Sequence, residues 1–242
     1  MRAYKEWGAL KLRIDALEPT HYIRNHLVLK TIQPLASAGS SVRIADVRCE
    51  SGYLAHALAQ LGYTLTAVDV SNEAIALAQQ SYTHPRLRFS QGDARSLSGT
   101  YDIILAIESL NRVNNDVEYL KQCGKKLAPK GLLILTVPAH EEYRSDFDNR
   151  IGNIRRYSAE ELSKKLQRSG FRVKSTHYYG YPLLHWYYFH VYLKASLKRR
   201  HLQRRKQSFF WQVLPLINKI FLYDLRYNDS RAINLLIVAE KT

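Results

Sequence analysis

The chain has 242 residues, 46% of them hydrophobic, and its 36 Lys and Arg exceed its 21 Asp and Glu, which gives a formal net charge of +15. This length predicts a single α/β domain over 1–242 with one sizeable core. Two cysteines exclude a disulfide framework, and no Cys/His spacing resembles a zinc site. Because the N-terminal segment lacks the apolar run of a signal peptide or membrane anchor, we expect a reduced, cytoplasmic protein without a bound metal.

Residues 42–138 alternate short apolar runs with segments of helical period, a pattern typical of repeated βα units around a parallel sheet. Five strands are expected, at 42–47, 64–70, 87–91, 101–107 and 131–137, with helices at 53–62, 72–80 and 116–128. Further along, a capping box of Ser158 and Glu161 predicts a helix that ends at Gly170. Two more strands are expected at 171–179 and 232–241. The pattern predicts an α/β fold with a doubly wound, mostly parallel seven-stranded sheet.

Residues 178–211 depart from this pattern and open an expected helical, basic and aromatic insertion at 178–230, before the last strand. Six tyrosines lie in 178–192, and seven Lys or Arg without an acid lie in 194–206. A 19-residue uncharged run here is long enough to span a bilayer, but its glycine, proline and three histidines argue against a span. One interpretation is a peripheral segment that binds an anionic membrane surface. The other is a helical flap on the core with a solvated basic face.

A polar loop, Asp46-Val-Arg-Cys-Glu-Ser-Gly52, joins the first expected strand to the first helix, where doubly wound proteins bind nucleotide-like ligands against backbone amides. It resembles the D-x-G-x-G-x-G loop of class I S-adenosylmethionine-dependent methyltransferases. Asp69, 17 residues after Gly52, matches the acid that accepts hydrogen bonds from both ribose hydroxyls in that family, and Gln91-Gly-Asp-Ala94 matches the stretch that contacts the adenine. The resemblance implies a Rossmann-like methyltransferase fold and S-adenosyl-L-methionine as the cofactor. The implied cofactor-binding residues are Asp46, Arg48, Glu50, Gly52, Asp69, Val70, Asp93, Ala94 and Glu108.

The chain departs from this family pattern at several positions. Arg48 and Glu50 replace the first two loop glycines, which allow a sharp turn and a close approach to the methionyl part of the ligand. Either Arg48 pairs with the ligand carboxylate and Glu50 with its ammonium, or the site is damaged or takes another ligand. Asn111 and Arg112 stand where relatives often have a Leu-Glu-His sequence, and Asn153 replaces the histidine usual before Arg-Arg-Tyr. Two proton carriers are therefore missing.

Segments 127–140 and 145–171 are similar to a subgroup associated with sugar, polysaccharide and lipid-linked glycan pathways. That resemblance implies methyl transfer to a glycan, a lipid-linked sugar or a similar small acceptor, in glycan biosynthesis. It leaves the acceptor and the methylated atom open.

Candidate acceptor-side residues follow the fifth expected strand, where the ligand crevices of such sheets open. A hydroxyl acceptor must lose a proton, and His140, Asp146 and Asp148 are the candidates to receive it. Arg155 and Arg156 are candidates to clamp a phosphate or carboxylate of the acceptor. Tyr157 either stacks on a sugar or packs in the core.

Two other functions remain as alternatives. The altered loop and the asparagines favour a catalytically impaired relative that keeps the fold as a binding or scaffolding module. RNA methylation ranks third, because the basic cluster suits an anionic polymer but the chain lacks the Asn/Asp-Pro-Pro-aromatic motif of amino-targeting nucleic-acid enzymes.

Overall fold

The computed structural model describes residues 2–34, 41–197 and 209–242. Within these ranges, seven strands form one sheet in the order β3-β2-β1-β4-β5-β7-β6. The last strand, β7, is antiparallel to both of its neighbours, and the remaining pairs are parallel. The strands are β1 Arg43–Val47, β2 Thr64–Asp69, β3 Leu87–Gln91, β4 Tyr101–Ile107, β5 Leu127–Pro138, β6 Phe171–Tyr179 and β7 Asn234–Lys241. The doubly wound, mostly parallel sheet expected from the sequence is confirmed.

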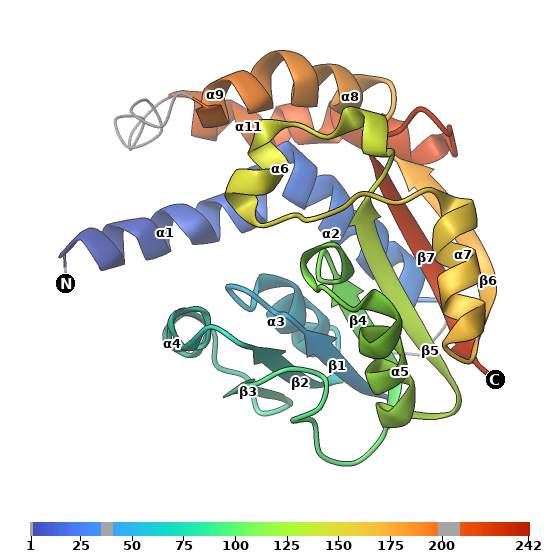
Figure 1. The fold of residues 1–242 in the computed structure, drawn as a ribbon. Helices are drawn as coiled ribbons and strands as arrows, with labels where there is room; N and C mark the ends of the chain where they lie inside the picture. The colour runs from blue at the N-terminus through green and yellow to red at the C-terminus, as the bar shows by residue number, and fades with distance from the viewer. Residues whose placement is uncertain (1, 35–40, 198–208) are drawn as a thin grey trace.

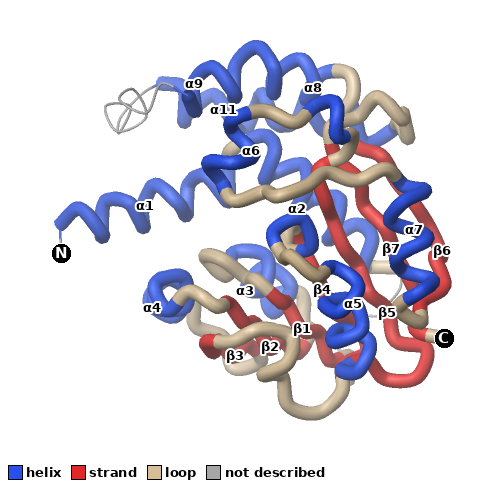
Figure 2. The backbone as a smooth tube through the Cα atoms, viewed as in Figure 1, coloured by secondary structure: helices blue, strands red, loops and turns tan. Residues whose placement is uncertain are grey.

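Helices cover both faces of this sheet (Figure 2). On one face, α2 (Pro19–Ile32) and α3 (Tyr53–Gln60) contribute buried side chains such as Ile23 and Leu58 to one core cluster. On the other face, α5 (Asp116–Lys126) and α7 (Ala159–Arg168) contribute Leu120 and Leu166 to a second cluster. The short helix α4 (Asn72–Ser81) contacts β2 and β3. The apolar residues at helical spacing therefore face the sheet.

Two N-terminal helices, α1 (Arg2–Leu17) and α2, were not expected from the sequence pattern. Their apolar stripes are weak because charged residues recur every few positions in this part of the chain. The start of α2 nevertheless carries a local signal. The Glu18 carboxylate accepts hydrogen bonds from the backbone N–H groups of Thr20 and His21, and Pro19 occupies the first helical position, where its missing N–H costs nothing.

A helical cap, defined as residues 183–197 and 209–226, precedes β7. It comprises α8 (Leu183–Tyr187), a π-helical turn η3 (Tyr188–Tyr192), α9 (Leu193–Leu197), α11 (Phe209–Phe221) and the 3₁₀ turn η4 (Leu222–Arg226). Figure 1 shows the cap, with α6 (Asp146–Ile151), above the end of the sheet toward which β5 points. Asn218 of α11 donates a hydrogen bond to the Leu17 carbonyl at the end of α1, 2.9 Å away. Helices therefore precede β7 as expected, although residues 178 and 179 belong to β6. Of the seven basic residues expected here, Lys194 lies in α9, and the six at 198–206 lie outside the described residues.

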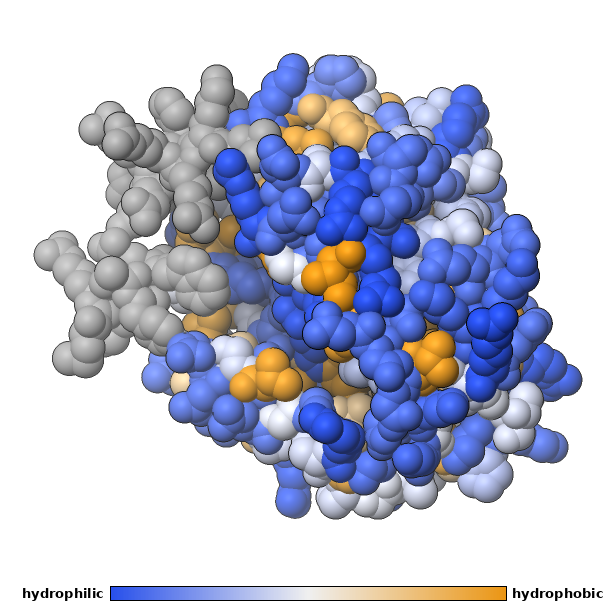
Figure 3. Space-filling view, in the orientation of Figure 1, coloured by the Kyte–Doolittle hydropathy of each residue, from blue (hydrophilic) through white to orange (hydrophobic). Residues whose placement is uncertain are grey.

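Part of the tyrosine-rich run 178–192 packs in the core, as expected for a helical flap on the core. Tyr179, Tyr187 and Tyr188 are buried, whereas Trp186 is 58% exposed. Buried and exposed side chains alternate along the run at helical spacing, so one helix face packs inward. In the described ranges no helix is both long enough and apolar enough to cross a membrane. Figure 3 shows a mainly hydrophilic face with scattered apolar side chains.

Asp224 fastens the cap, and its loss should destabilise the protein. Its fully buried carboxylate accepts hydrogen bonds from the N–H groups of Leu183 and Leu184, at 3.1 and 2.7 Å. Because Asp224→Ala leaves two buried donors without partners, we expect it to lower the free energy of unfolding by about 2 to 4 kcal/mol in urea titrations. Asp229→Ala is the matched control, since Asp229 pairs with Arg231 at the surface. Equal midpoints for the two variants would contradict this role.

Candidate functional site

The cofactor-side residues lie together at the carboxyl ends of four parallel strands. Asp46 lies near the end of β1 and pairs in register with Ala67 of β2, while Asp69 ends β2 and pairs with Gln91 of β3. Asp93 and Ala94 follow β3, and Glu108 follows β4. Carboxyl ends of parallel strands meet at one edge of a sheet, which is where ligands of doubly wound folds bind.

The loop after β1 keeps the left-handed backbone of the family motif, although Gly52 is the one motif glycine that this chain retains. Arg48, Glu50 and Gly52 have φ values of 93°, 50° and 80°, so all three positions of the family motif are left-handed. The N–H groups of Arg48 and Cys49 donate to the Val68 carbonyl at 2.7 and 3.0 Å, which holds the turn in place. At Gly52 a Cβ would come within 2.6 Å of the Phe89 ring, so only glycine fits there.

Asp69 is held in a position suited to the ribose of the cofactor. Its carboxylate accepts hydrogen bonds from the N–H groups of Glu50 (3.0 Å) and Ser71 (2.9 Å), and each oxygen retains acceptor capacity for a hydroxyl. Val70, beside it, is 63% exposed and offers an apolar contact for the adenine. Arg95 donates two hydrogen bonds to Asp93 Oδ2, at 2.6 and 2.9 Å. Asp69 and Val70 therefore fit the adenosine half of the cofactor, whereas Asp93 is already paired within the protein.

A small cavity of about 30 Å³ lies where the methionyl half would bind. Asp46 and Arg48 line it, and among the described residues neither Oδ1 of Asp46 nor Nε of Arg48 has a hydrogen-bond partner, although both atoms are buried. A carboxylate and a guanidinium without partners match the ammonium and carboxylate of the methionyl group. A cavity of this size holds about one water molecule. The methionyl half therefore needs more space than this cavity offers.

Asp46 has an unusually basic carboxyl group. Burial raises its pKa, and the nearby carboxylates of Asp69 and Glu50 raise it further, against a lowering effect of Arg24, to about 7. A protonated Asp46 relieves the repulsion among three carboxylates, and an incoming ammonium would favour the ionised form.

Glu50 is already paired, with a lysine from α1. Lys11 Nζ lies 2.6 Å from both Glu50 Oε2 and Asp15 Oδ1, and Asp15 also contacts His21 at 2.9 Å and accepts a hydrogen bond from Ser51. Although burial acts to raise the pKa of Glu50, the charges of Lys11, Arg24 and His21 together outweigh it, and the pKa falls to about 2. Glu50 therefore links the loop to α1. Asp46 remains as the carboxyl group that can bind a ligand ammonium. Nothing in the sequence pattern pointed to Lys11.

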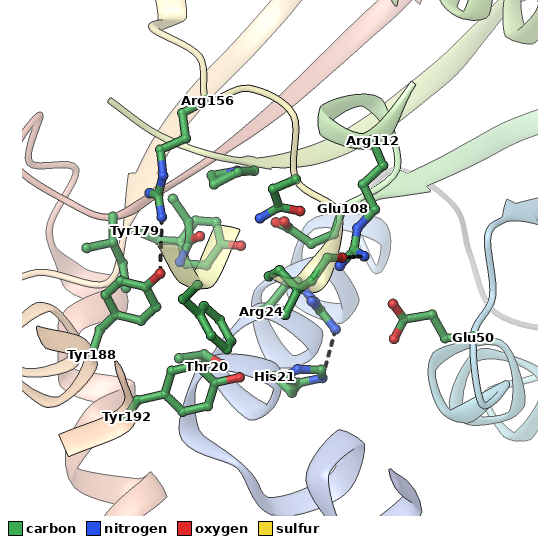
Figure 4. A pocket seen from close by; sticks show the side chains of 16 residues that line it. Thr20, His21, Arg24, Glu50, Glu108, Arg112, Arg156, Tyr179, Tyr188 and Tyr192 are labelled. Carbon is green, nitrogen blue, oxygen red and sulfur yellow. Dashed lines mark hydrogen bonds between the residues drawn. The ribbon is translucent and has the colours of Figure 1, made fainter. Parts of the chain in front are cut away.

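A larger cavity of about 100 Å³ adjoins the small one, and Arg24 and Glu50 line both (Figure 4). Its walls come from α2, the ends of β4, β5 and β6, the start of β7, α6 and the inner face of the cap. The lining residues are Thr20, His21, Arg24, Glu50, Glu108, Arg112, Pro138, Phe147, Ile151, Asn153, Arg156, Tyr179, Tyr188, Tyr192, Ile233 and Asn234. A space of this kind, next to the cofactor loops, can hold a small acceptor or one end of a larger molecule.

None of the three predicted proton acceptors lines this cavity. His140 stacks on Tyr178 with ring centroids 5.4 Å apart, and Asp146 is exposed at the start of α6. Asp148 is buried and accepts hydrogen bonds from Arg156 at 3.0 Å and from Asn153 at 3.1 Å. Its charge is satisfied within the protein, so the geometry assigns Asp148 a structural role in place of the expected catalytic one.

Of the predicted acceptor-binding residues, only Arg156 lines the cavity, where it also donates a hydrogen bond to the Tyr188 hydroxyl at 3.1 Å. Arg155 pairs with Asp116 at 2.9 Å, and the fully buried Tyr157 donates to the same carboxylate at 3.1 Å. These two residues therefore fasten the loop before α7 to α5. The packing interpretation of Tyr157 agrees with this placement.

The two asparagines that replace histidines meet each other. Asn111 Nδ2 donates to Asn153 Oδ1 at 2.7 Å, and both side chains are buried. An amide pair does not exchange protons near neutral pH, so proton removal falls to another group. Within the described lining only Glu50 and Glu108 are acidic, and Glu108 Oε1 is buried without a partner.

Comparison with known proteins agrees with this geometry. Residues 20–176 match the family model described as a methyltransferase domain. A ubiquinone biosynthesis O-methyltransferase of Caulobacter sp. (strain K31) is 34% identical over 100 residues, 39% of this chain and 40% of that protein. A trans-aconitate 2-methyltransferase of Deinococcus radiodurans is 26% identical over 138 residues, 53% of this chain and 54% of that protein. The chain thus spans about half, or less, of the length of these relatives.

Solved structures show the same fold. A methyltransferase from Haloferax volcanii, in complex with the Trm112 methyltransferase activator, superposes with a TM-score of 0.64 at 16% identity and covers 98% of this chain and 97% of its own. Magnesium protoporphyrin IX methyltransferase from Synechocystis, with bound S-adenosylhomocysteine, gives 0.59 at 13% identity and covers 100% and 95%. The family match over 20–176 and the ordered cofactor loops show that the chain belongs to the class I S-adenosylmethionine-dependent methyltransferase family.

Proposed function

We propose that the protein transfers the methyl group of S-adenosylmethionine to a small acceptor held in the larger cavity. The observation that carries this proposal is that Arg24 and Glu50 line both cavities, so a donor on the loop side and an acceptor on the cap side would meet. Alignment of two bound reactants supplies much of the acceleration of an in-line displacement. The cofactor supplies an electrophilic methyl group when bound; the chain aligns the reactants and excludes water.

Glu108 is the group best placed to take a proton from a hydroxyl acceptor. It lies at the carboxyl end of β4, lines the larger cavity and points its unpartnered Oε1 away from solvent (Figure 4). Its backbone N–H donates to the Thr136 carbonyl at 3.0 Å, which fixes its position against β5. A positioned carboxylate of this kind can act as a general base.

The acceptor is a small molecule or one terminal unit of a larger one. The cavity volume of about 100 Å³ excludes an extended glycan chain from the interior. If the acceptor is the glycan or lipid-linked sugar that the subgroup resemblance implies, only its terminal sugar would enter the cavity. The names of the Caulobacter and Deinococcus relatives support small organic acceptors as a class.

Replacement of Glu108 tests the catalytic part of the proposal. With S-adenosylmethionine and a panel of small hydroxy acids, phenols and sugar phosphates, we expect the wild type to release S-adenosylhomocysteine. Glu108→Gln should lower kcat by a factor of about 10² to 10⁴ at saturating cofactor. Cofactor binding without turnover on any acceptor would favour the binding or scaffolding alternative.

The basic carboxyl of Asp46 predicts pH-dependent cofactor affinity. Below a pKa of about 7 the group carries a proton that an ammonium partner must displace. Calorimetric affinity for S-adenosylhomocysteine should therefore fall about tenfold from pH 8 to pH 6. Asp46→Asn should weaken binding at pH 8 and remove most of this dependence. An unchanged pH profile in that variant would show that another group titrates.

We also propose that the cap rests on an anionic membrane surface. On α11 and η4, Leu216, Ile220 and Tyr223 are 65%, 59% and 46% exposed, and their spacing places them on one helix face. Lys219 and Arg226 are exposed beside them. Between Glu161 and Asp229 the chain has only one acid, the buried Asp224, so this surface lacks anionic side chains. Apolar residues flanked by cations are typical of interfacial helices.

Vesicle co-sedimentation tests this surface. Phosphatidylserine-containing vesicles should bind the protein more strongly than phosphatidylcholine vesicles, and salt should weaken the difference. Leu216→Ser with Ile220→Ser should reduce binding, whereas Leu61→Ser, at an exposed apolar position of the α3 end, should not. Equal binding to both vesicle types would reject the electrostatic part. Retention on single-stranded RNA in place of vesicles would favour the RNA alternative.

A further inference from the structure

The larger cavity has an excess of positive charge. Three arginines and two glutamates line it. Arg156 is paired with Asp148, whereas Lys11, from outside the cavity, is shared between Glu50 and Asp15. Arg24 and Arg112 lie near the carboxylates of Glu108 and Glu50, which act to raise the pKa of both arginines. Buried guanidinium N–H donors are costly unless a hydrogen-bond partner completes them.

The same two arginines have hydrogen-bonding capacity to spare. Nε of Arg24 and Nε of Arg112 are both buried, and neither has a partner within the described part of the chain. Arg112 Nη1 donates a hydrogen bond to the Ile151 carbonyl, and Arg24 Nη2 lies 3.2 Å from His21 Nδ1. Anchored guanidinium groups with free N–H donors are suited to bind a carboxylate or phosphate.

Neighbouring charges act differently on the two arginines. Burial and the adjacent guanidinium of Arg48 lower the pKa of Arg112, although Glu50 and Glu108 act in the opposite sense. Burial also acts to lower the pKa of Arg24, but nearby charges, led by the carboxylates of Glu108 and Glu50, outweigh it and raise the pKa. A bound sulfonium cofactor would add one more positive charge beside the cavity, which an anionic acceptor would offset.

The remaining wall indicates what the anionic group is attached to. Phe147, Ile151, Tyr188 and Ile233 line the cavity with apolar or aromatic surface. Figure 4 shows Arg24 and Arg112 converging near Glu108, with the tyrosines of the cap on the opposite side. An acceptor with an anionic end and an apolar or flat body would satisfy both halves of the cavity.

We propose that Arg24 and Arg112 form an anion-binding subsite that selects acceptors bearing a carboxylate or phosphate next to an apolar body. This inference rests on the proposed function, since it names the acceptor class of the same cavity. It relocates the anion clamp that the sequence suggested at Arg155 and Arg156, both of which already bind aspartates of the protein. Arg112 is a specificity residue here, and Glu108 remains the proton acceptor.

Matched neutral and charged probes test the subsite. Fluorine NMR with para-fluorobenzoate and para-fluorobenzamide, in the presence of S-adenosylhomocysteine, compares two molecules of nearly equal shape. We expect benzoate to bind at least about tenfold more tightly, and we expect inorganic phosphate to compete with it. Equal affinities of the two probes, or their absence from the cavity, would overturn the inference.

Variants separate this subsite from the cofactor site. Arg112→Gln should weaken benzoate binding at least about tenfold while it leaves benzamide and S-adenosylhomocysteine affinities within threefold. Arg112→Lys keeps the charge without the planar fork and should give an intermediate loss. Arg150→Gln, on the exposed side of α6, is the control and should change nothing. If Arg112→Gln does not fold, the lysine variant still gives the comparison.

The outcomes distinguish this inference from the proposed function. Displacement of benzoate by S-adenosylhomocysteine would mean that the arginines bind the cofactor carboxylate, which overturns the acceptor subsite and leaves methyl transfer intact. Charge-selective binding that coexists with the cofactor supports the subsite. A protein that binds the cofactor and the anionic probe but transfers no methyl group to any carboxylate or phosphate acceptor would fail the proposed function while the subsite stands.

Discussion

The shape of the loop between β1 and α3 is the constraint on which the site depends. Left-handed conformations at Arg48 and Glu50 cost on the order of 1 to 2 kcal/mol each, because a Cβ crowds the backbone. Hydrogen bonds from outside the loop offset this strain: the Val68 carbonyl accepts two of its N–H groups, and Asp69 accepts a third. The Lys11–Glu50 pair adds a further tether. Tertiary contacts thus hold Arg48 and Glu50 in a backbone conformation that only glycine adopts without strain. The side chains of Arg48 and Glu50 also reduce the space at the methionyl end of the site.

The cap has an inner surface that lines the larger cavity and an outer surface that is exposed. Its inner surface supplies Tyr188 and Tyr192 to the acceptor cavity, while α11 presents Leu216 and Ile220 to the outside. Asp224 and Asn218 hold these pieces to each other and to α1. The same helices thus contribute both to the larger cavity and to the outer surface that we propose as membrane-facing.

The sheet was predictable because its signals are local. Apolar runs of strand length, helical spacing of leucines and the capping box at Ser158 each report on a few neighbouring residues, and the structure places the expected elements there. The cofactor edge was predictable for a related reason, since carboxyl ends of parallel strands must meet. The acceptor side of the site could not be predicted in this way. Asp148 and Arg156 are eight residues apart, and only the folded chain shows that they neutralise each other. Arg24 and Arg112 come from segments 88 residues apart, and no sequence period brings them together.

The Asn111–Asn153 pair has a consequence for how the site could have changed. Asn153 accepts a hydrogen bond from Asn111 and donates one to Asp148, so the two asparagine positions are coupled across 42 residues of sequence. A histidine at either position alone would contact the remaining asparagine amide and would leave a buried polar atom without a hydrogen bond. We therefore expect a variant with a single histidine to be less stable than the present pair. The hydrogen bonding of Asn111 and Asn153 thus limits which side chains this side of the site can carry.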